Sequence, residues 1–360
     1  MKKVIIILVI VAIIIIANVL IFNLSNNNEQ VGSTNTHVNT NINRINNENE
    51  TDTTSGENEV NQVEQATNNN TDYSTVYFTS NISSDGLMNI YQALGFEPQG
   101  NVAIKLSTGE AGGNYYLSPD LIRELVQSVD GTIVECNTAY GGSRSNTAMH
   151  RQVAEDHGFT RIANVDILDE NGSMNLTVPN GTHLEYDMVG ANYANYDSVI
   201  VLSHFKGHSM AGFGGAVKNI SIGFASSSGK SLIHSAGTRT SGFGGASQDD
   251  FLESMAEAAS AVATDKGDDI VYISVMNNLS VDCDCDSNPA EPDMHDIGIL
   301  ASTDPVALDK ACVDLVYEAP DGASLIQRME SRNGIHTLEY GAEIGLGNLN
   351  YEIVNIDARQ

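Results

Sequence analysis

A segment rich in glycine, lysine and histidine runs from Ser198 to Gln248, and it contains no aspartate or glutamate. This absence is unusual in a chain that carries 46 acidic residues among 360 and has a formal net charge of −29. The cationic and imidazole side chains of the segment are Lys206, Lys218, Lys230, Arg239, His204, His208 and His234. Because no carboxylate lies nearby in the sequence to neutralise these lysines, the pattern predicts a site for a negatively charged ligand.

The glycines of this segment lie where a ligand can approach the backbone. The stretch SHFKGHSMAGFGGAVKN, residues 203–219, follows an apolar run that predicts a buried strand. Glycine has no Cβ, so its amide can approach a ligand closely, and a helix that begins near these glycines would direct free N–H groups toward an anion. The motif is neither a phosphate-binding P-loop nor GxGxxG, so a phosphate, a carboxylate and a nucleotide all stay open, as does a plain surface loop with solvated lysines. The predicted ligand-binding residues here are Gly212, Gly214, Gly215, Lys218 and Lys230.

Two side chains of the same loop are candidates for catalysis. His208 has an ordinary pKa near neutrality, which suits a general acid or base. Lys206, two residues earlier, and Lys218 could act as bases if burial lowered their pKa. We take His208 and Lys206 as candidate catalytic residues, with a structural role as the alternative. For His204 and His234 the structural role is favoured.

A second cluster combines cysteines with acids in the stretch VDCDCDSNPAEPDMHDIG, residues 281–298. On an extended segment the thiols of Cys283 and Cys285 would face the same side. Thiolates bind zinc, copper(I) and iron–sulfur clusters, so we predict a metal site at these two cysteines, with zinc or iron as the candidate metals. The further ligands would have to come from Cys136, Cys312, Asp293 or His295.

Other interpretations of this cluster stay open. The two cysteines could form a disulfide with each other, although one intervening residue makes that geometry uncommon. The acids around them could form a solvated loop, or could bind Ca²⁺ or Mg²⁺ through oxygen. Further along the chain, Asp304 is typical of a helix N-cap, whereas Asp309 and Asp314 are unexplained in an apolar helical stretch.

The composition narrows the class of partner. A pI near 4.3 argues against nucleic acid and anionic lipid surfaces, because these partners require a broad basic surface. Four cysteines are too few for a disulfide scaffold of this size. With these partners disfavoured, the expected ligand of the basic segment is an anionic small molecule. The membrane is a second expected partner, through the N-terminal segment described next.

The N-terminus is predicted to be a membrane anchor. Lys2 and Lys3 precede an apolar run from Val4 to Phe22 that is interrupted by Asn18. At about 1.5 Å per residue this run nearly spans a hydrocarbon core of about 30 Å, and it is longer than the core of a cleaved signal peptide. Residues 1–22 would form one transmembrane helix, and the lysines before it place the folded domain on the extracytoplasmic side of the cell membrane.

Residues 23–75 are predicted to be a disordered linker, because Asn, Thr, Ser, Glu and Gln dominate and apolar residues are scarce. The folded domain is predicted to span residues 76–360. There, strand-like segments alternate with helix-like segments, which favours an α/β domain with a mainly parallel sheet and flanking helices. The strand-like segments are 76–78, 101–107, 131–137, 197–205, 269–276 and 296–302, and the helix-like segments are 87–95, 118–129, 145–158, 249–267 and 304–319.

Together these motifs resemble the domain-of-unknown-function family 362, whose members include proteins described as iron–sulfur centre proteins. The resemblance rests on VYFTSNISSDGLMNIYQALG, GSRSNTAMH, SHFKGHSMAGFGGAVKNISIGFASSSGK, CDC, DIGILASTDPVALDKACVDLV and GLGNLNYE, which occur in this order. It covers residues 76–352. The blocks GFGGAVKN and DIGILAS with DPVALD are the most specific.

The resemblance adds two site residues and shows one departure. The family pattern retained here includes the KGH and CDC elements, Lys218 with Asn219, Lys230 and His234, so Asn219 and His234 join the predicted ligand-binding residues. Many relatives carry a ferredoxin-like insertion after the histidine that matches His234. This chain has only SAGTRTSGFGGAS there, without cysteine, which argues against a resident pair of iron–sulfur clusters.

Three functions fit these features. The first is a membrane-anchored extracytoplasmic enzyme, metal- or thiol-dependent, that acts on an anionic small molecule. The second is a surface-tethered protein that binds a ligand or a metal without catalysis. The third, an acidic structural protein of the cell envelope, is disfavoured because it needs no basic glycine-rich loop after a buried strand.

Overall fold

The structure, a computed structural model, describes residues 73–357. The predicted anchor, residues 1–22, and nearly all of the predicted linker lie outside this range. Among the described residues, no helix is long and apolar enough to cross a membrane. The first strand begins at Ser74, so the folded part starts two residues before the predicted boundary.

Within residues 73–357 the chain forms a central sheet of eight strands that is mainly parallel. Only β11 runs antiparallel to its neighbours, β10 and β1, while every other adjacent pair is parallel. From one edge to the other the strands are β12 (Tyr351–Asn355), β1 (Ser74–Thr79), β11 (Gly298–Ser302), β10 (Ile270–Met276), β7 (Ser198–His204), β2 (Val102–Lys105), β3 (Thr132–Glu135) and β4 (Val165–Ile167). The predicted α/β class with a mainly parallel sheet is confirmed.

Helices connect and cover these strands. They are α2 (Ser84–Leu94), α3 (Pro119–Ser128), α4 (Thr147–Asp156), α5 (Ala216–Ser221), α6 (Ser227–His234), α7 (Gln248–Lys266), α8 (Pro305–Glu318), α9 (Ala323–Ser331) and α10 (His336–Glu343), with 3₁₀ turns η1 (Phe159–Arg161), η2 (Ala191–Asn195) and η3 (Gly267–Asp269). Asp304 caps α8 as predicted, because its carboxylate accepts the N–H groups of Val306 and Ala307 at 2.9 and 3.0 Å. Ser118 occupies the N-cap position of α3, but its hydroxyl makes no capping hydrogen bond.

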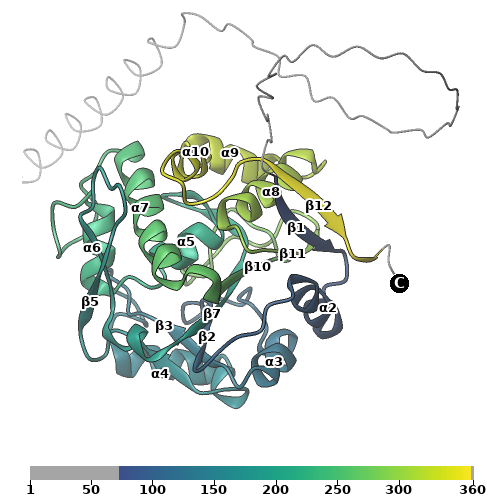
Figure 1. The fold of residues 1–360 in the computed structure, drawn as a ribbon, viewed down its shortest axis with the longest axis horizontal. Helices are drawn as coiled ribbons and strands as arrows, with labels where there is room; N and C mark the ends of the chain where they lie inside the picture. The colour runs from purple at the N-terminus through teal and green to yellow at the C-terminus, as the bar shows by residue number, and fades with distance from the viewer. Residues whose placement is uncertain (1–72, 358–360) are drawn as a thin grey trace, which may run out of the picture. The chain divides into compact units, whose positions relative to one another are not determined.

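The sheet is buried on both faces, as the apolar sequence of β7 requires. Val199 and Val201 enter a core that includes residues of α5, α7 and α8. Ile200 and Leu202 point the other way, into a core that includes residues of α2 and α3. This alternation is typical of parallel strands covered by helices on both sides (Figure 1).

Two short antiparallel pairs lie outside the main sheet. One is β5 (Ser173–Thr177) with β6 (Tyr186–Gly190), and the other is β8 (Lys206–His208) with β9 (Gly212–Gly214). One residue, Phe205, separates the end of β7 from β8, and because β8 pairs with β9 the KGH element is a short strand rather than an open loop. It stands at the edge of the sheet where the carboxyl ends of β2, β3, β7 and β10 meet, which is where ligands bind in open α/β sheets.

Candidate functional site

A cavity of about 560 Å³ lies at the carboxyl ends of the parallel strands. The last residues of β2, β3 and β7, which are Lys105, Glu135 and His204, all line it. The loop that follows β10 and carries the CDC element covers another side. The fold therefore brings the two sequence clusters, the basic glycine-rich segment and the cysteine segment, to the same cavity.

All but one of the predicted site residues line this cavity. They are Lys206, His208, Gly214, Gly215, Lys218, Asn219, Lys230, His234, Cys283 and Cys285. Gly212 does not line it. Its φ is +81°, and an added Cβ would come within 3.0 Å of Gly334 and 3.2 Å of Met329. Glycine at position 212 is explained by its left-handed backbone and by packing near α9, not by a ligand.

The predicted helix start is present, but a side chain of the protein itself occupies it. The Asp309 carboxylate accepts the N–H groups of Ala216 and Val217, at the start of α5, at 2.7 and 2.9 Å. A Cβ on Gly215 would lie 2.2 Å from Asp309 Oδ1, so this glycine makes room for the carboxylate. Burial raises the pKa of Asp309 to about 7. The first two N–H groups of α5 are therefore taken, which corrects the expectation that the start of this helix binds the ligand and explains an acid in apolar α8.

Three lysines on the cavity wall form no ion pair with any described residue. Lys105 donates to the Leu106 carbonyl at 2.7 Å and to Asn219 Oδ1 at 3.0 Å. Lys230 donates to a backbone carbonyl, and the Lys218 ammonium forms no hydrogen bond within residues 73–357. Burial lowers the pKa of Lys105 and of Lys218 to about 8, and neighbouring positive charges contribute at Lys218. These lysines have no carboxylate within ion-pair distance among residues 73–357, although Glu135 and Asp284 act on Lys105 and Lys218 from further away.

Asn219 acts on the ligand site through Lys105. Its Nδ2 donates to Ser203 Oγ at 3.1 Å and to the Lys105 and Leu202 carbonyl oxygens at 3.4 and 3.3 Å. These bonds join α5 to the ends of β2 and β7. Because the amide oxygen accepts from Lys105 Nζ, the side chain predicted to bind ligand instead positions a lysine that faces the cavity.

Arg144 is a cation of the wall that the sequence analysis did not single out. It lies between Glu110, at 3.3 Å, and Glu135, at 3.1 Å, and His150 Nε2 lies 3.0 Å from the same Glu135 oxygen. Burial alone raises the pKa of Glu135, but His150 and Arg144 hold it well below its ordinary value. The sequence did contain a signal for this buried charge network, because Lys105 and Glu135 are charged residues inside apolar strand segments.

Lys206, a predicted catalytic residue, is held in an ion pair. Its Nζ lies 3.0 Å from Asp284 Oδ1, and it donates to the Tyr115 carbonyl at 2.8 Å. His204 Nδ1 lies 2.8 Å from the other Asp284 oxygen. The middle residue of the CDC element therefore fastens this loop to β7 and β8, and Lys206 is engaged in that attachment.

Gly207 allows the CDC loop to approach β8. Its N–H donates to the Ser280 carbonyl at 2.8 Å. A Cβ at this position would lie 2.3 Å from the Val281 carbonyl oxygen, a distance that no side chain tolerates. The glycine of the KGH element is thus required by a backbone of the same chain.

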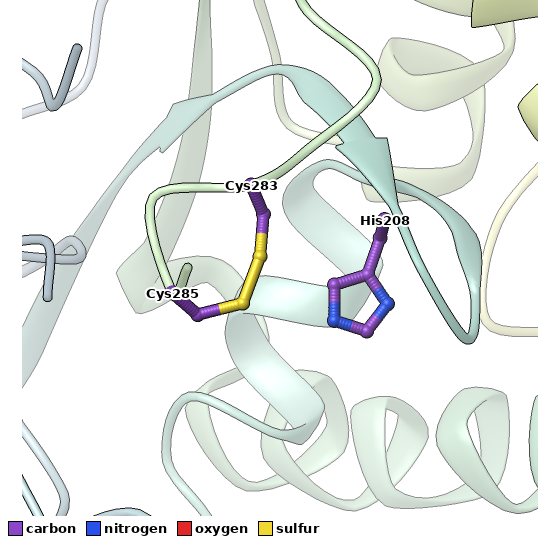
Figure 2. Close-up of side chains that lie close together, drawn as sticks. All are labelled: His208, Cys283 and Cys285. Atoms are coloured by element: carbon purple, nitrogen blue, oxygen red, sulfur yellow. A yellow bond between two sulfur atoms is a disulfide. The ribbon is translucent and has the colours of Figure 1, made fainter. Parts of the chain in front are cut away.

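Cys283 and Cys285 form a disulfide with each other, the alternative that the sequence left open. Figure 2 shows the His208 ring beside it, and a ring nitrogen and both sulfurs lie within 4.8 Å of one another. This spacing would suit a metal, but metal-binding cysteines are thiolates, and these sulfurs are bonded to each other. The remaining cysteines, Cys136 and Cys312, are buried thiols whose pKa burial raises. The predicted zinc or iron site therefore does not fit the residues as they are placed.

The tautomer of His208 also argues against a metal. The N–H groups of Ala211 and Met210 donate to its Nδ1 at 2.9 and 3.3 Å, so Nδ1 carries a lone pair. Burial lowers the pKa of His208 well below its ordinary value, and the proton of the neutral ring is then on Nε2. His208 is therefore a hydrogen-bond donor at Nε2, where a metal ligand needs a lone pair.

His234 presents a hydrogen-bond acceptor, whereas His208 presents a donor. Its Nδ1 donates to the Lys230 carbonyl at 2.7 Å, which leaves the lone pair on Nε2. Burial lowers its pKa to about 4, and its ring stacks on Phe251. At neutral pH the wall thus offers one N–H donor and one nitrogen acceptor beside the three lysines.

The family model described as "Domain of unknown function (DUF362)" matches residues 102–314, more than half of the chain, which confirms the resemblance seen in the sequence. No curated protein matches. Among solved structures, the lactate racemase apoprotein from Thermoanaerobacterium thermosaccharolyticum aligns with 15% identity and a TM-score of 0.39, over 68% of this chain and 57% of that one. A Thermotoga maritima protein aligns with 10% identity and a TM-score of 0.38, over 72% and 58%. The chain spans less than two thirds of either protein, and likeness this weak carries no functional argument.

Proposed function

This chain belongs to the DUF362 family, and we propose that it binds a small anionic molecule in the cavity at the carboxyl ends of β2, β3 and β7. The observation that carries the proposal is the set of Lys105, Lys218 and Lys230, which share one cavity and have no ion-pair partner among residues 73–357. A buried charge without a counter-ion costs folding free energy. A ligand that supplies the counter-ion explains why three such lysines are together.

The disulfide on the wall of the same cavity provides the reactive group of the proposed enzyme. A thiolate on the ligand attacks one sulfur, breaks the S–S bond and forms a mixed disulfide, while the other cysteine leaves as a thiolate. A second ligand thiol then attacks the mixed disulfide, which yields two free cysteines and the disulfide of the ligand. Exchange with a different small-molecule disulfide, which leaves as two thiols, restores the Cys283–Cys285 bond for the next turnover. The substrate class is therefore a small thiol that bears a carboxylate or a phosphate.

The chain's own residues would assist each step. Lys105, Lys218 and Lys230 hold the anionic end of the thiol beside the disulfide. The Nε2–H of His208 faces the sulfurs and stabilises the departing thiolate, as hydrogen-bond donors do for developing negative charge. Asp284, fixed by Lys206 and His204, keeps the CDC loop in place while the bond opens.

Binding without catalysis is the second candidate, and the ion pair of Lys206 with Asp284 favours it. That pair occupies the lysine which the sequence suggested as a base. In this case the disulfide would only brace the CDC loop. The two candidates share the anion pocket and differ in the reactivity of the disulfide.

The test compares an anionic thiol with a neutral one. The full-length chain is treated with mercaptopropionate or with mercaptoethanol, and the loss of the disulfide is followed by alkylation and mass spectrometry. At equal thiolate concentration the anionic thiol should react roughly 10- to 100-fold faster, the worth of one charge-assisted hydrogen bond. This preference should vanish in the Lys105→Met/Lys218→Met variant and persist in Lys310→Met, which changes a lysine outside the cavity.

Propionate, which lacks the thiol, distinguishes anion binding from thiol–disulfide exchange. Propionate binding by calorimetry without faster reduction by mercaptopropionate would leave the binding function and reject the thiol chemistry. If neither propionate nor phosphate bound, both forms of the proposal would fail.

We also propose that residues 1–22 tether the domain to the extracytoplasmic face of the cell membrane. The support is the pair of N-terminal lysines followed by the apolar run to Phe22. The full chain should remain with membranes during alkaline carbonate extraction, and a variant without residues 1–22 should be released. Release of both would contradict the anchor.

A further inference from the structure

A second cluster of titratable side chains lies where the connection between β5 and β6 meets α7 and α10. One nitrogen or oxygen atom from each of His183, Asp250 and Glu253 lies within 4.8 Å of the others. None of these residues lines the cavity described above. We propose that His183, Asp250 and Glu253 bind a divalent zinc ion. This site is independent of the proposed function.

Helix α7 presents both carboxylates of the site. Asp250 and Glu253 are three residues apart, so they lie on the same face of the helix. Glu253 Oε2 lies 2.6 Å from His183 Nε2, and these side chains are 21% and 17% exposed, so an ion can reach them. The Asp250 carboxylate has no hydrogen bond or ion pair with any described residue. A ligand oxygen is thus free beside a paired imidazole.

The loop that carries His183 is fixed before any ion binds. The carboxylate of Glu257, one turn after Glu253 on α7 and fully buried, accepts the N–H groups of Thr182, His183 and Leu184 at 2.6, 3.0 and 2.7 Å. The Tyr340 hydroxyl donates to the same carboxylate at 2.8 Å. The imidazole is therefore presented to the carboxylates by an ordered backbone, which is what a metal site requires of its support.

His336, the first residue of α10, orients the ligating carboxylate. Its Nε2 lies 2.8 Å from Glu253 Oε1, the oxygen that does not face His183. Its Nδ1 lies 4.0 Å from Glu339 Oε2. Partners that hold a ligand from outside in this way tune metal sites, so His336 is a positioning residue here.

The donor set points to zinc among the common divalent ions. Zinc takes imidazole nitrogen and carboxylate oxygen in tetrahedral sites and leaves a fourth position for water. Calcium and magnesium prefer oxygen alone, so the imidazole argues against them. Tetrahedral ligand atoms at zinc distances are about 3.4 Å apart, so His183 Nε2 and Glu253 Oε2 must separate by a small side-chain rotation. Zinc must also displace the proton that His183 Nε2 donates to Glu253, which would then move to Nδ1 or to solvent.

The test is a calorimetric titration with Zn²⁺ of the full-length chain carrying Cys283→Ser and Cys285→Ser, so that the cysteines contribute nothing. One equivalent should bind with micromolar or tighter affinity. Asp250→Asn and Glu253→Gln should each weaken binding by at least about 100-fold, and His336→Ala by about tenfold. The matched control is Asp249→Asn, which changes the adjacent carboxylate, bound to Asn333 at 2.8 Å, and should leave affinity unchanged.

Thermal unfolding separates lost binding from lost folding. Zn²⁺ should raise the unfolding temperature of the parent and of Asp249→Asn, but not that of a folded Asp250→Asn variant. If the parent bound no Zn²⁺, or if Asp250→Asn bound it as tightly as Asp249→Asn does, the site would be rejected.

Discussion

The cations that line the cavity fall into two groups with different partners. Arg144 and Lys206 lie 3.1 and 3.0 Å from buried carboxylate oxygens. Lys105, Lys218 and Lys230 lie against uncharged oxygens or against no partner in the described part of the chain. The first group neutralises acids that the strand ends bring together, so it holds the fold. The second group keeps its charge, in a protein rich enough in carboxylates to have neutralised it.

The difference shows how one cavity can serve both stability and binding. A paired buried cation, once removed, leaves an uncompensated carboxylate and therefore destabilises the protein. An unpaired buried cation, once removed, takes an electrostatic cost away. The two groups should therefore respond in opposite ways to the same kind of substitution.

The largest effect should follow from Arg144→Met. This change removes the guanidinium that the buried Glu110 and Glu135 carboxylates share, and should lower the free energy of unfolding by about 3–5 kcal/mol. Urea denaturation measures it. Arg123→Met, which breaks an exposed pair with Asp120, should cost less than about 1 kcal/mol. Similar losses of unfolding free energy in the two variants would contradict the structural role assigned to Arg144.

Lys218→Met should have the reverse pattern. Affinity for propionate should fall by roughly 10- to 100-fold, the worth of one charge-assisted hydrogen bond, while the free energy of unfolding stays equal or rises. Calorimetry and urea denaturation of the same samples give both quantities. A large loss of stability would place Lys218 with Arg144 in the structural group.

The anion affinity should also depend on pH. Lys105 and Lys218 have pKa values of about 8 without ligand, and a bound anion raises both. Affinity for propionate, whose charge is constant in this range, should therefore be full below pH 8 and fall above it, by up to about tenfold per pH unit for each lysine. The Lys105→Met/Lys218→Met variant should show a flat profile over the same range. A wild-type profile just as flat would show that neither lysine contacts the anion.

The smallest predicted effect is a difference between two histidine rings in the nitrogen that carries the proton, and observing it requires no change in ligand affinity. Nitrogen-15 NMR at neutral pH should find His208 protonated on Nε2 and His234 protonated on Nδ1, because their backbone partners fix opposite tautomers. His208→Phe and His234→Phe assign the signals. The same tautomer in both rings would remove the donor and acceptor pair from the cavity wall.

The strands and helices predicted from sequence lie within three residues of those in the structure, because their apolar patterns and caps are local signals. Residues 76–78, for example, lie inside β1, and 304–319 contains all of α8. The reversed direction of β11 and the short pair β8–β9 had no such signal. They are set by contacts between segments far apart in the chain.

The residues of the candidate site likewise fall into those with a local sequence signal and those placed by contacts between distant segments. Residues of the acid-free segment were found because their charge pattern is contiguous in the sequence. The part played by Asp309 was not predictable, since it caps a helix 93 residues earlier in the chain. The same holds for Asp284, which reaches Lys206 and His204 only in the folded protein.

The position of β1 has a consequence for the order in which the protein can mature. This strand is the first of the domain, yet its partners are β11 and β12, and Thr75 bonds to side chains 227 and 277 positions later. Figure 1 shows the first and last strands side by side. While the chain is being synthesised, β1 must wait with both hydrogen-bonding edges open until β11 has emerged, and with one edge open until β12 has emerged. The sheet is thus completed by β12, and a protein truncated before β12 would leave one hydrogen-bonding edge of β1 unpaired.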